Sequence, residues 1–133
     1  MLLNLTNHPS QRWPEEQRRA AKARWGSVTD YPFPTVDPEA TTAQVAELAR
    51  RTVEQVCALR PEAVLCQGEM SLTLALVTLL QNRDIQVYVT CSRRESRECV
   101  RDGVVVKTAC FRFAGFREYP RCLIQPLSTA QTS

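Results

Sequence analysis

The chain has 133 residues, of which 44% are hydrophobic and 23% charged, and its formal net charge is +3. This composition is that of one globular domain and excludes a disordered chain. The richest apolar run, residues 72–80, is about half as long as a membrane-spanning helix, and the N-terminus lacks the features of a signal peptide. We therefore expect a cytoplasmic protein without membrane association, with one domain over residues 1–126 and a flexible polar tail over 127–133.

Six cysteines raise the question of a zinc site or a disulfide framework. No two of them have the Cys-x-x-Cys spacing of structural zinc sites, and the single histidine, His8, is far from all of them in the sequence. Without a secretory signal, disulfides are not expected either. We interpret several of the cysteines as small buried hydrophobic residues in strands and one helix, and we expect no metal and no cofactor.

The N-terminal third predicts a strand, a helix and a second strand. Residues 2–5 form a short apolar run, and Pro14 is suited to the first position of a helix that ends before Gly26. Acidic residues open this helix and basic residues close it, as the helix dipole favours. Residues 27–31 predict the second strand, after which three prolines impose an extended loop.

The middle of the chain continues this alternation. Thr41 or Thr42 caps a second helix, in which apolar residues recur at helical spacing as far as Leu59. Residues 62–66 predict a third strand. The helix that follows, beginning at residue 69 or 71 and ending near 81, is apolar nearly all round and should be well buried.

The C-terminal part predicts a fourth strand, a loop and a hairpin. Residues 85–89 are β-branched or aromatic in the manner of a strand. Residues 90–96 are polar and predict a loop, and Asp102-Gly103 is a strong turn signal between two further strands. Strands that alternate with helices predict a three-layer α/β fold of the Rossmann-like class, with a mostly parallel sheet and a C-terminal β-hairpin.

In such a sheet, ligands bind beyond the carboxyl ends of the strands. This rule selects the loops at residues 6–10, 30–34, 67–71 and 90–94, which are rich in hydrogen-bonding groups. Gly68 would let the backbone approach a ligand closely, in front of the free N–H groups of the next helix. Glu69 is equally well explained as a residue that stabilises the helix dipole. His8 is as consistent with a structural role as with a catalytic one.

Basic residues are concentrated towards the C-terminus. Between residues 91 and 122 there are eight basic and four acidic side chains, an excess that favours an anionic ligand. The hydroxyl of Ser92 and the guanidinium groups of Arg93 and Arg94 could hold a phosphate, although a solvated loop explains them equally well. The motifs of dinucleotide-binding and P-loop proteins are absent, and no DNA partner is expected.

Four short motifs, taken in order, resemble a known family. Asn-His-Pro-Ser at 7–10, Pro-Phe-Pro-x-Val-Asp-Pro at 32–38, Gln-Gly-Glu at 67–69 and Ser-Arg-Arg at 92–94 are similar to small CRISPR-associated proteins of the Csx type, which are related to the CARF fold. The resemblance covers about residues 2–120. It implies a homodimer that binds cyclic oligoadenylate, cyclic tetra-adenylate in preference to cyclic hexa-adenylate. Some members resemble ring nucleases, which linearise this messenger without a metal through attack of a ribose 2′-OH.

The resemblance also implies roles for individual residues. Its catalytic candidates are His8, Ser10 and Arg93. Its ligand-binding candidates are Asn7, Pro9, Phe33, Gln67, Gly68, Glu69, Ser92, Arg94 and Arg117. A protein that binds the messenger without cutting it is the first alternative, and an unrelated enzyme acting on a small nucleotide or sugar phosphate is the second.

Overall fold

The computed structural model describes residues 1–121; the end of the predicted domain and the predicted tail at 127–133 lie outside the described residues. Strands and helices alternate as predicted, and none of the described helices is long and apolar enough to cross a membrane. The elements are β1 (Leu2–Thr6), the 3-10 helix η1 (Ser10–Arg12), α1 (Glu15–Trp25), β2 (Val28–Asp30), α2 (Thr42–Ala58), β3 (Ala63–Gln67), α3 (Met70–Asn82), β4 (Gln86–Arg101) and β5 (Val104–Glu118).

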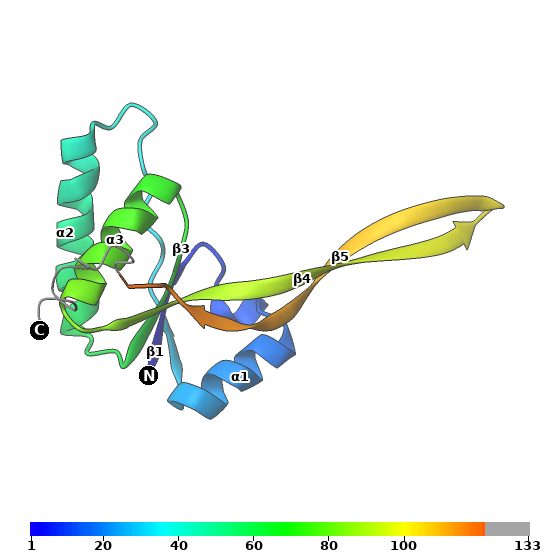
Figure 1. Cartoon of the computed structure of the whole chain (residues 1–133), viewed down its shortest axis with the longest axis horizontal. Helices are drawn as coiled ribbons and strands as arrows, with labels where there is room; N and C mark the ends of the chain where they lie inside the picture. The colour runs from blue at the N-terminus through cyan, green and yellow to red at the C-terminus, as the bar shows by residue number, and fades with distance from the viewer. Residues whose placement is uncertain (122–133) are drawn as a thin grey trace, which may run out of the picture.

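The described strands form one five-stranded sheet in the order β2-β1-β3-β4-β5 (Figure 1). The pairs β1–β2, β1–β3 and β3–β4 are parallel, and β5 is antiparallel to β4. The prediction of a mostly parallel Rossmann-like sheet with a C-terminal hairpin is confirmed. The chain passes from β1 to β2 on one side of β1 and then from β2 to β3 on the other side, so the sheet has a topological switch point between β1 and β3.

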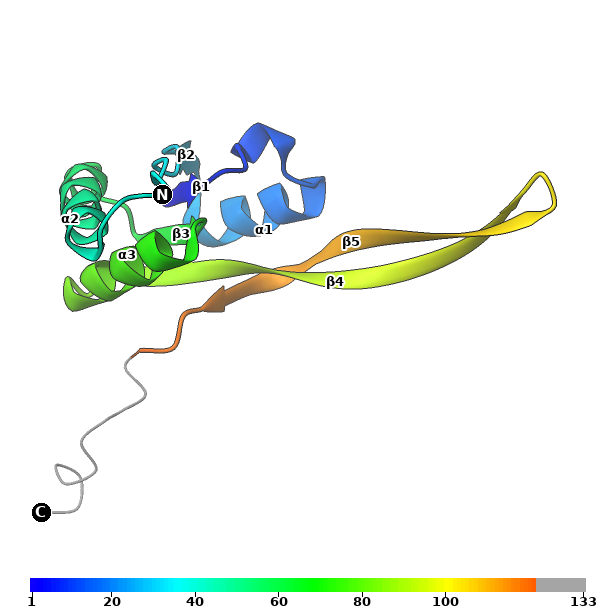
Figure 2. The ribbon, with the colours of Figure 1, turned by 90° about the horizontal axis from the view of Figure 1, so that it is seen from above.

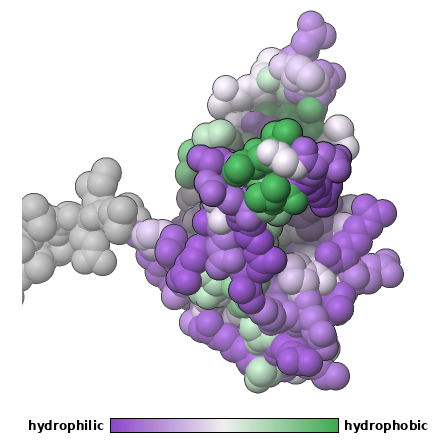
Figure 3. All heavy atoms as spheres, turned by 90° about the vertical axis from the view of Figure 1, so that its right-hand side faces the viewer, coloured by the Kyte–Doolittle hydropathy of each residue, from purple (hydrophilic) through white to green (hydrophobic). Residues whose placement is uncertain are grey.

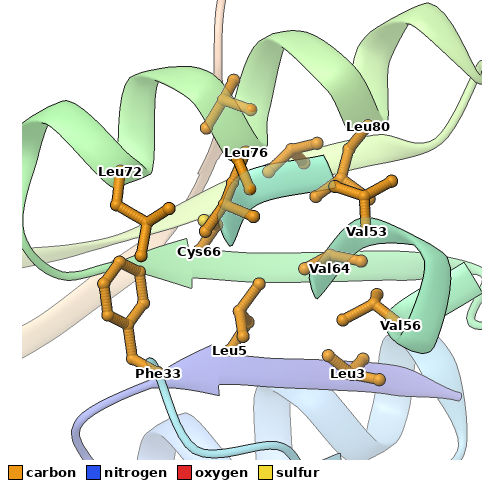
Figure 4. Close-up of a cluster of buried hydrophobic side chains, with 13 residues drawn as sticks. Leu3, Leu5, Phe33, Val53, Val56, Val64, Cys66, Leu72, Leu76 and Leu80 are labelled. Atoms are coloured by element: carbon orange, nitrogen blue, oxygen red, sulfur yellow. The ribbon is translucent and has the colours of Figure 1, made fainter. Parts of the chain in front are cut away.

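The sheet is covered on both faces, which gives three layers (Figure 2). Alternate residues of β1 point to opposite faces: Leu2 joins a cluster with Trp13 and Trp25 on the α1 side, whereas Leu3 and Leu5 join a cluster formed with α2 and α3. Figure 4 shows this second cluster, in which leucines of α3 lie over the side chains of β1 and β3. A buried parallel sheet requires apolar residues on both faces of its strands, and the sequence of β1 supplies them.

Local signals account for the helix ends. Thr41 Oγ1 accepts a hydrogen bond from Gln44 N (3.1 Å), and Gln44 Oε1 accepts one from Thr41 N (2.9 Å), which makes a reciprocal capping box at the start of α2. Gly26 ends α1 with a φ of 84°, a conformation that glycine adopts without steric cost. The predicted threonine cap and glycine stop are both confirmed.

The interpretation of the cysteines holds best for Cys66. Its side chain is buried in β3, and burial raises the pKa of its thiol to about 12. The other cysteines within residues 1–121, Cys57, Cys91, Cys99 and Cys110, are half-buried, and all five are free thiols. Cys122 lies outside the described residues.

The predicted loop at residues 90–96 is wrong. These residues belong to β4, which runs without interruption from Gln86 to Arg101. The strand is this long because β5 pairs with β4 from Tyr88↔Glu118 to Arg101↔Val104. The backbone hydrogen bonds to β5 hold residues 90–96 in a strand although their side chains are polar. No glycine or proline interrupts β4, and polar side chains on both faces are what a solvated ribbon requires.

The C-terminal part of β4 and the N-terminal part of β5 project from the body as a long ribbon (Figure 1). The β3–β4 ladder ends at Leu65↔Tyr88, and a bulge follows between Cys91 and Ser92. We call the projecting ribbon, residues 92–113, the arm. Its turn at Asp102 (φ 52°) and Gly103 (φ 75°) has the positive φ values of a type I′ hairpin, which confirms the turn prediction.

Candidate functional site

A cavity of about 290 Å³ lies on the α1 side of the sheet, beyond the carboxyl ends of β1 and β3. This is the topological switch point, where doubly wound proteins bind their ligands. The cavity is bounded by the start of α1 on one side and by the root of the arm on the other. The residues that line it are Thr6, His8, Arg12, Trp13, Pro14, Gln17, Leu65, Gln67, Thr90, Ser92, Phe111 and Phe113.

The walls combine aromatic rings with positive charge. Trp13 is buried, whereas Phe111 at the arm root is 71% exposed. Arg12 and His8 are exposed on the side of η1, and no carboxylate occurs among the described residues that line the cavity. Aromatic faces stack on nucleobases, and an arginine without a competing carboxylate attracts phosphate. The cavity therefore has the chemistry of a site for a nucleotide-like anion.

Two glutamines define the floor of the cavity. Gln67 Oε1 accepts a hydrogen bond from the backbone N–H of Thr90 (2.9 Å), beyond the point where the β3–β4 ladder ends. Gln17, buried on α1, donates from Nε2 to the hydroxyl of Thr90 (3.4 Å). Because β4 diverges from β3 here to enter the arm, side-chain amides replace the missing backbone contacts. The gap between these two strands is the opening that becomes the cavity.

The loop that carries His8 is fixed by a buried asparagine. Asn4 Nδ2 donates to the carbonyl oxygen of His8 (2.8 Å) and to Asp30 Oδ1 (2.9 Å), and Asn4 Oδ1 accepts from the hydroxyl of Thr6 (2.8 Å). The indole N–H of Trp13 donates to the same His8 carbonyl (3.0 Å). The backbone of His8 is thus held from two directions, while its imidazole stays exposed at the cavity.

Ser10 does not line this cavity. Its hydroxyl donates to Asp30 Oδ2 (3.0 Å), and its backbone N–H also reaches the Asp30 carboxylate (3.1 Å to Oδ1). A hydroxyl that is held in this way orders the start of η1. Asn7, Pro9 and Phe33 lie with Asp30 around a smaller pocket of about 160 Å³ on the β2 side of the loop.

Gly68 is required by packing, which accounts for a glycine at this position without a ligand. A Cβ at this position would lie 2.5 Å from the ring of Phe33, and that ring is itself 7% exposed in the core. Phe33 N also donates to the carbonyl oxygen of Thr6 (3.4 Å), so the ring is anchored through its backbone. The close approach at Gly68 is made by a side chain of the same protein.

We expect Gly68→Ala to destabilise the fold by about 1–3 kcal/mol, because the new methyl group overpacks the Phe33 ring. Chemical denaturation of the variant and the wild type would measure this. Phe33→Leu in the Gly68→Ala background should recover part of the loss, since the smaller side chain leaves room for the methyl group. Equal losses for the single and the double variant would contradict the clash.

Glu69 caps α3 through its side chain. Its carboxylate accepts hydrogen bonds from Ser71 N (2.9 Å), Ser71 Oγ (2.7 Å) and Leu72 N (2.8 Å). The hydrogen bond from the Ser71 hydroxyl, followed by those from the two backbone N–H groups, lowers the pKa of Glu69. The helix-stabilising interpretation of Glu69 accounts for these contacts, and they occupy the N–H groups that were expected to face a ligand.

The arginines of the arm root divide between two faces. Ser92 pairs with Phe113 and Arg94 with Phe111, and paired residues share a face of a ribbon. This is the face that borders the cavity. Arg93, which pairs with Arg112, and Arg117, which pairs with Val89, lie on the opposite face.

The cavity brings together His8, Gln67 and Ser92 of the predicted site residues. It does not bring together the predicted catalytic set, because Ser10 is bound to Asp30 and Arg93 is on the far face of the ribbon. Of the other lining residues, Thr6 and Thr90 lie in the loops selected from the sequence. Sequence reasoning missed the rest, which are Arg12, Trp13, Pro14, Gln17, Leu65, Phe111 and Phe113. The alternating Phe111-x-Phe113 pattern was a signal, but its direction depended on the register of β5.

A wider groove of about 950 Å³ lies on the other face of the sheet, beside α3. Met70, Leu74 and Val77 form much of its wall, and Tyr119 borders it while donating its hydroxyl to the carbonyl of Cys66 (2.7 Å). Burial, followed by the effect of Cys66, raises the pKa of Tyr119 to about 12. This mostly apolar wall suits a phosphate ligand less well than the cavity on the α1 side.

A comparison with known protein families assigns the chain to one of them. A family model described as the Uncharacterized protein MJ1673 family matches residues 1–117. The chain belongs to the MJ1673 family. No curated protein and no solved structure matches it. The MJ1673 match spans every residue that lines the cavity and the whole arm.

Proposed function

We propose that this cytoplasmic protein is a ring nuclease that binds cyclic oligoadenylate, cyclic tetra-adenylate above all, at the cavity of the switch point and linearises it without a metal. The observation that carries the proposal is the composition of the cavity, in which Arg12 and His8 face three aromatic rings and no carboxylate among the described lining residues. The resemblance in the sequence supplies the identity of the messenger, and the cavity supplies a site of suitable chemistry.

The cavity is small for such a ligand. Ligand pockets range upward from about 300 Å³, so a volume of about 290 Å³ admits one nucleoside-sized group and not a whole ring. The aromatic walls suit an adenine base, and the amides of Gln17 and Gln67 suit its polar edge. The remainder of a ring would lie outside this cavity.

The proposed chemistry is a transesterification. The ribose 2′-OH attacks the adjacent phosphorus in line, the bond to the 5′-oxygen breaks, and the products are a 2′,3′-cyclic phosphate and a 5′-OH in a linear chain. His8 would take the proton from the 2′-OH as general base, and water would supply a proton to the departing 5′-oxygen on the opposite side of the phosphorus. Arg12 would stabilise the charge that develops on the phosphorane. In this scheme Arg12 replaces Arg93, which does not border the cavity.

The test is incubation of the purified protein with labelled cyclic tetra-adenylate and cyclic hexa-adenylate in EDTA. Conversion to linear products that carry a 2′,3′-cyclic phosphate supports the nuclease. Retention of the intact ring without cleavage supports the alternative, a protein that only captures the messenger. The absence of both binding and cleavage removes this proposal in favour of another nucleotide or sugar phosphate.

We expect Arg12→Ala to weaken messenger binding about 10–100-fold, the loss typical of one hydrogen bond to a charged group. His8→Ala should abolish cleavage while leaving binding nearly intact. Arg51→Ala, which removes an exposed arginine from α2 on the other face of the sheet, is the matched control. Fluorescence anisotropy gives the affinities. A larger effect of Arg93→Ala or Ser10→Ala than of Arg12→Ala would restore the assignment made from the sequence.

A further inference from the structure

The arm has one face that stays exposed to solvent among the described residues. The β4–β5 register from Ser92↔Phe113 to Arg101↔Val104 is unbroken, so the paired side chains alternate between two faces. One face, which we call the Phe111 face, carries Arg94, Ser96, Glu98, Val100, Val105, Lys107, Ala109 and Phe111. All of these side chains are exposed, and three are large and apolar: Phe111 and Val100 at 71% and Val105 at 59%.

The arm has little support from the body: its side-chain ion pair with the body joins Arg112 at the root to Glu16 of α1 (3.4 Å). Among the described residues, every side-chain hydrogen bond and ion pair of residues 93–111 is made within the arm. A two-stranded hairpin is only marginally stable in water unless a further layer packs on it. Figure 3 views the molecule with the arm tip towards the reader and shows an apolar patch there, bordered by polar residues. Exposed apolar side chains that gather in a patch mark a surface for interaction with another molecule.

The pattern along the Phe111 face is complementary to itself. The apolar groups lie at the two ends, with Phe111 at the root and Val100 with Val105 at the tip. Between them are the small side chains of Ser96 and Ala109, followed by the ion pair of Glu98 with Lys107 (3.7 Å). When two such faces meet antiparallel about a twofold axis, each Phe111 opposes Val105 of the other copy, and Arg94, which pairs with Phe111 at the root, opposes Val100. The small side chains of Ser96 and Ala109 then leave room for the Glu98–Lys107 ion pair of the other copy.

We propose that two copies of the chain associate by packing the Phe111 faces of their arms together, antiparallel about a twofold axis. The tip of each arm then lies at the mouth of the other copy's cavity, because Phe111, Phe113 and Ser92 both line that cavity and form the root of the arm. Each cavity is therefore complete only in the dimer. The statement about the cavity rests on the proposed function, whereas the association itself does not.

The distribution of charge over the two faces of the arm favours a second copy of the chain over a nucleic acid as the partner of the Phe111 face. The arm carries six basic and three acidic residues, a net +3 equal to that of the whole chain. Four of its arginines, Arg93, Arg97, Arg101 and Arg112, lie on the face opposite the Phe111 face. A phosphate backbone would be drawn to that basic face. The Phe111 face, whose Glu98 is paired with Lys107, is left for an apolar and self-complementary partner.

The test is the oligomeric state of the full chain without ligand, by sedimentation over a concentration series in the micromolar range. The contact, eight residues a side, is small compared with the roughly 20–30 of a standard interface, so we expect a micromolar dimer. V105D should raise the dissociation constant about 100-fold or more, because two carboxylates would be buried against phenylalanine. V104D is the matched control: this neighbouring valine is similarly exposed, at 62%, but lies on the other face and should leave the dimer intact.

A charge-pair rescue tests the register. In V105D/F111K each new carboxylate should face a new ammonium group of the other copy, and association should recover to within about 10-fold of the wild type. A monomeric wild type, equal effects of V104D and V105D, or a failure of V105D/F111K to recover would each overturn the proposal. Circular dichroism confirms that the variants fold. Because no messenger is present, this result is independent of whether the protein cleaves one.

Discussion

Replacing Asn4 by aspartate is expected to destabilise the fold by about 3–5 kcal/mol at neutral pH, the range measured when a buried charge is left without a partner. Asn4 is 1% exposed, and its Nδ2 donates to two acceptors, the carbonyl of His8 and the carboxylate of Asp30. The substitution preserves the shape of the side chain but turns the donor into a third acceptor. The two original bonds become repulsions, and the loop that bears His8 loses its anchor.

The pH dependence gives the sharper measurement. The carboxyl group at position 4 is buried beside Asp30, so its pKa in the folded variant should lie above the unfolded value of about 4. The folded variant then binds more protons than the unfolded chain, so its stability falls as pH rises through this range. Denaturation midpoints at several pH values should show the variant approaching the wild type on acidification. Asn7→Asp, at an exposed position, is the control, and equal midpoints for both variants at pH 7 would contradict the argument.

The layers and the order of elements follow from short-range signals that tertiary contacts do not override. Thr41 and Gly26 mark helix ends by side-chain capping and by a positive φ, which are properties of single residues. Asp102-Gly103 specifies its turn in the same way. Apolar runs of strand length between helices leave few arrangements other than a covered parallel sheet. The fold class was therefore predictable.

The arm was not predictable because its stability comes from pairing. Residues 90–96 have the composition of a loop, and only the backbone bonds to β5 make them a strand. The bulge between Cys91 and Ser92 then decides which side chains face α1. Without that register, Phe111 and Arg93 could not be assigned to a face. For this reason the prediction from the sequence included Arg93 in the site and missed Phe111.

The candidate site divides in a similar way. The motif residues Ser10, Gly68 and Glu69 occupy the predicted loops, but each is engaged with its own chain, by Asp30, by the Phe33 ring and by the start of α3 respectively. They shape the strand ends from which a site is built. The motif residues His8, Gln67 and Ser92 line the cavity, but its aromatic walls come from Trp13, Phe111 and Phe113, which lie outside the motifs. Motifs located the site, and three-dimensional packing supplied its surface.

Trp13 belongs both to the core and to the wall of the cavity, and its removal is expected to have the other large effect. Trp13→Ala should cost about 3–5 kcal/mol of folding free energy, since it empties a site where the ring is only 5% exposed. The ring packs with Phe116 at a centroid distance of 6.5 Å, and its indole N–H holds the carbonyl of His8. The variant loses part of the core and one wall of the cavity together, so stability alone does not separate the two contributions.

Trp13→Phe separates them. Most of the apolar contact remains, while the hydrogen bond to His8 is lost, which should cost about 1 kcal/mol of stability. Trp25→Phe is the matched control, because Trp25 lies in the same cluster and its ring contacts Tyr88 and Phe116 at 5.1 and 5.4 Å. If the indole positions the His8 loop, Trp13→Phe should reduce binding and cleavage of the proposed messenger beyond its effect on stability, whereas Trp25→Phe should reduce neither. Equal affinities in the two variants would mean that Asn4 alone is sufficient to hold the loop.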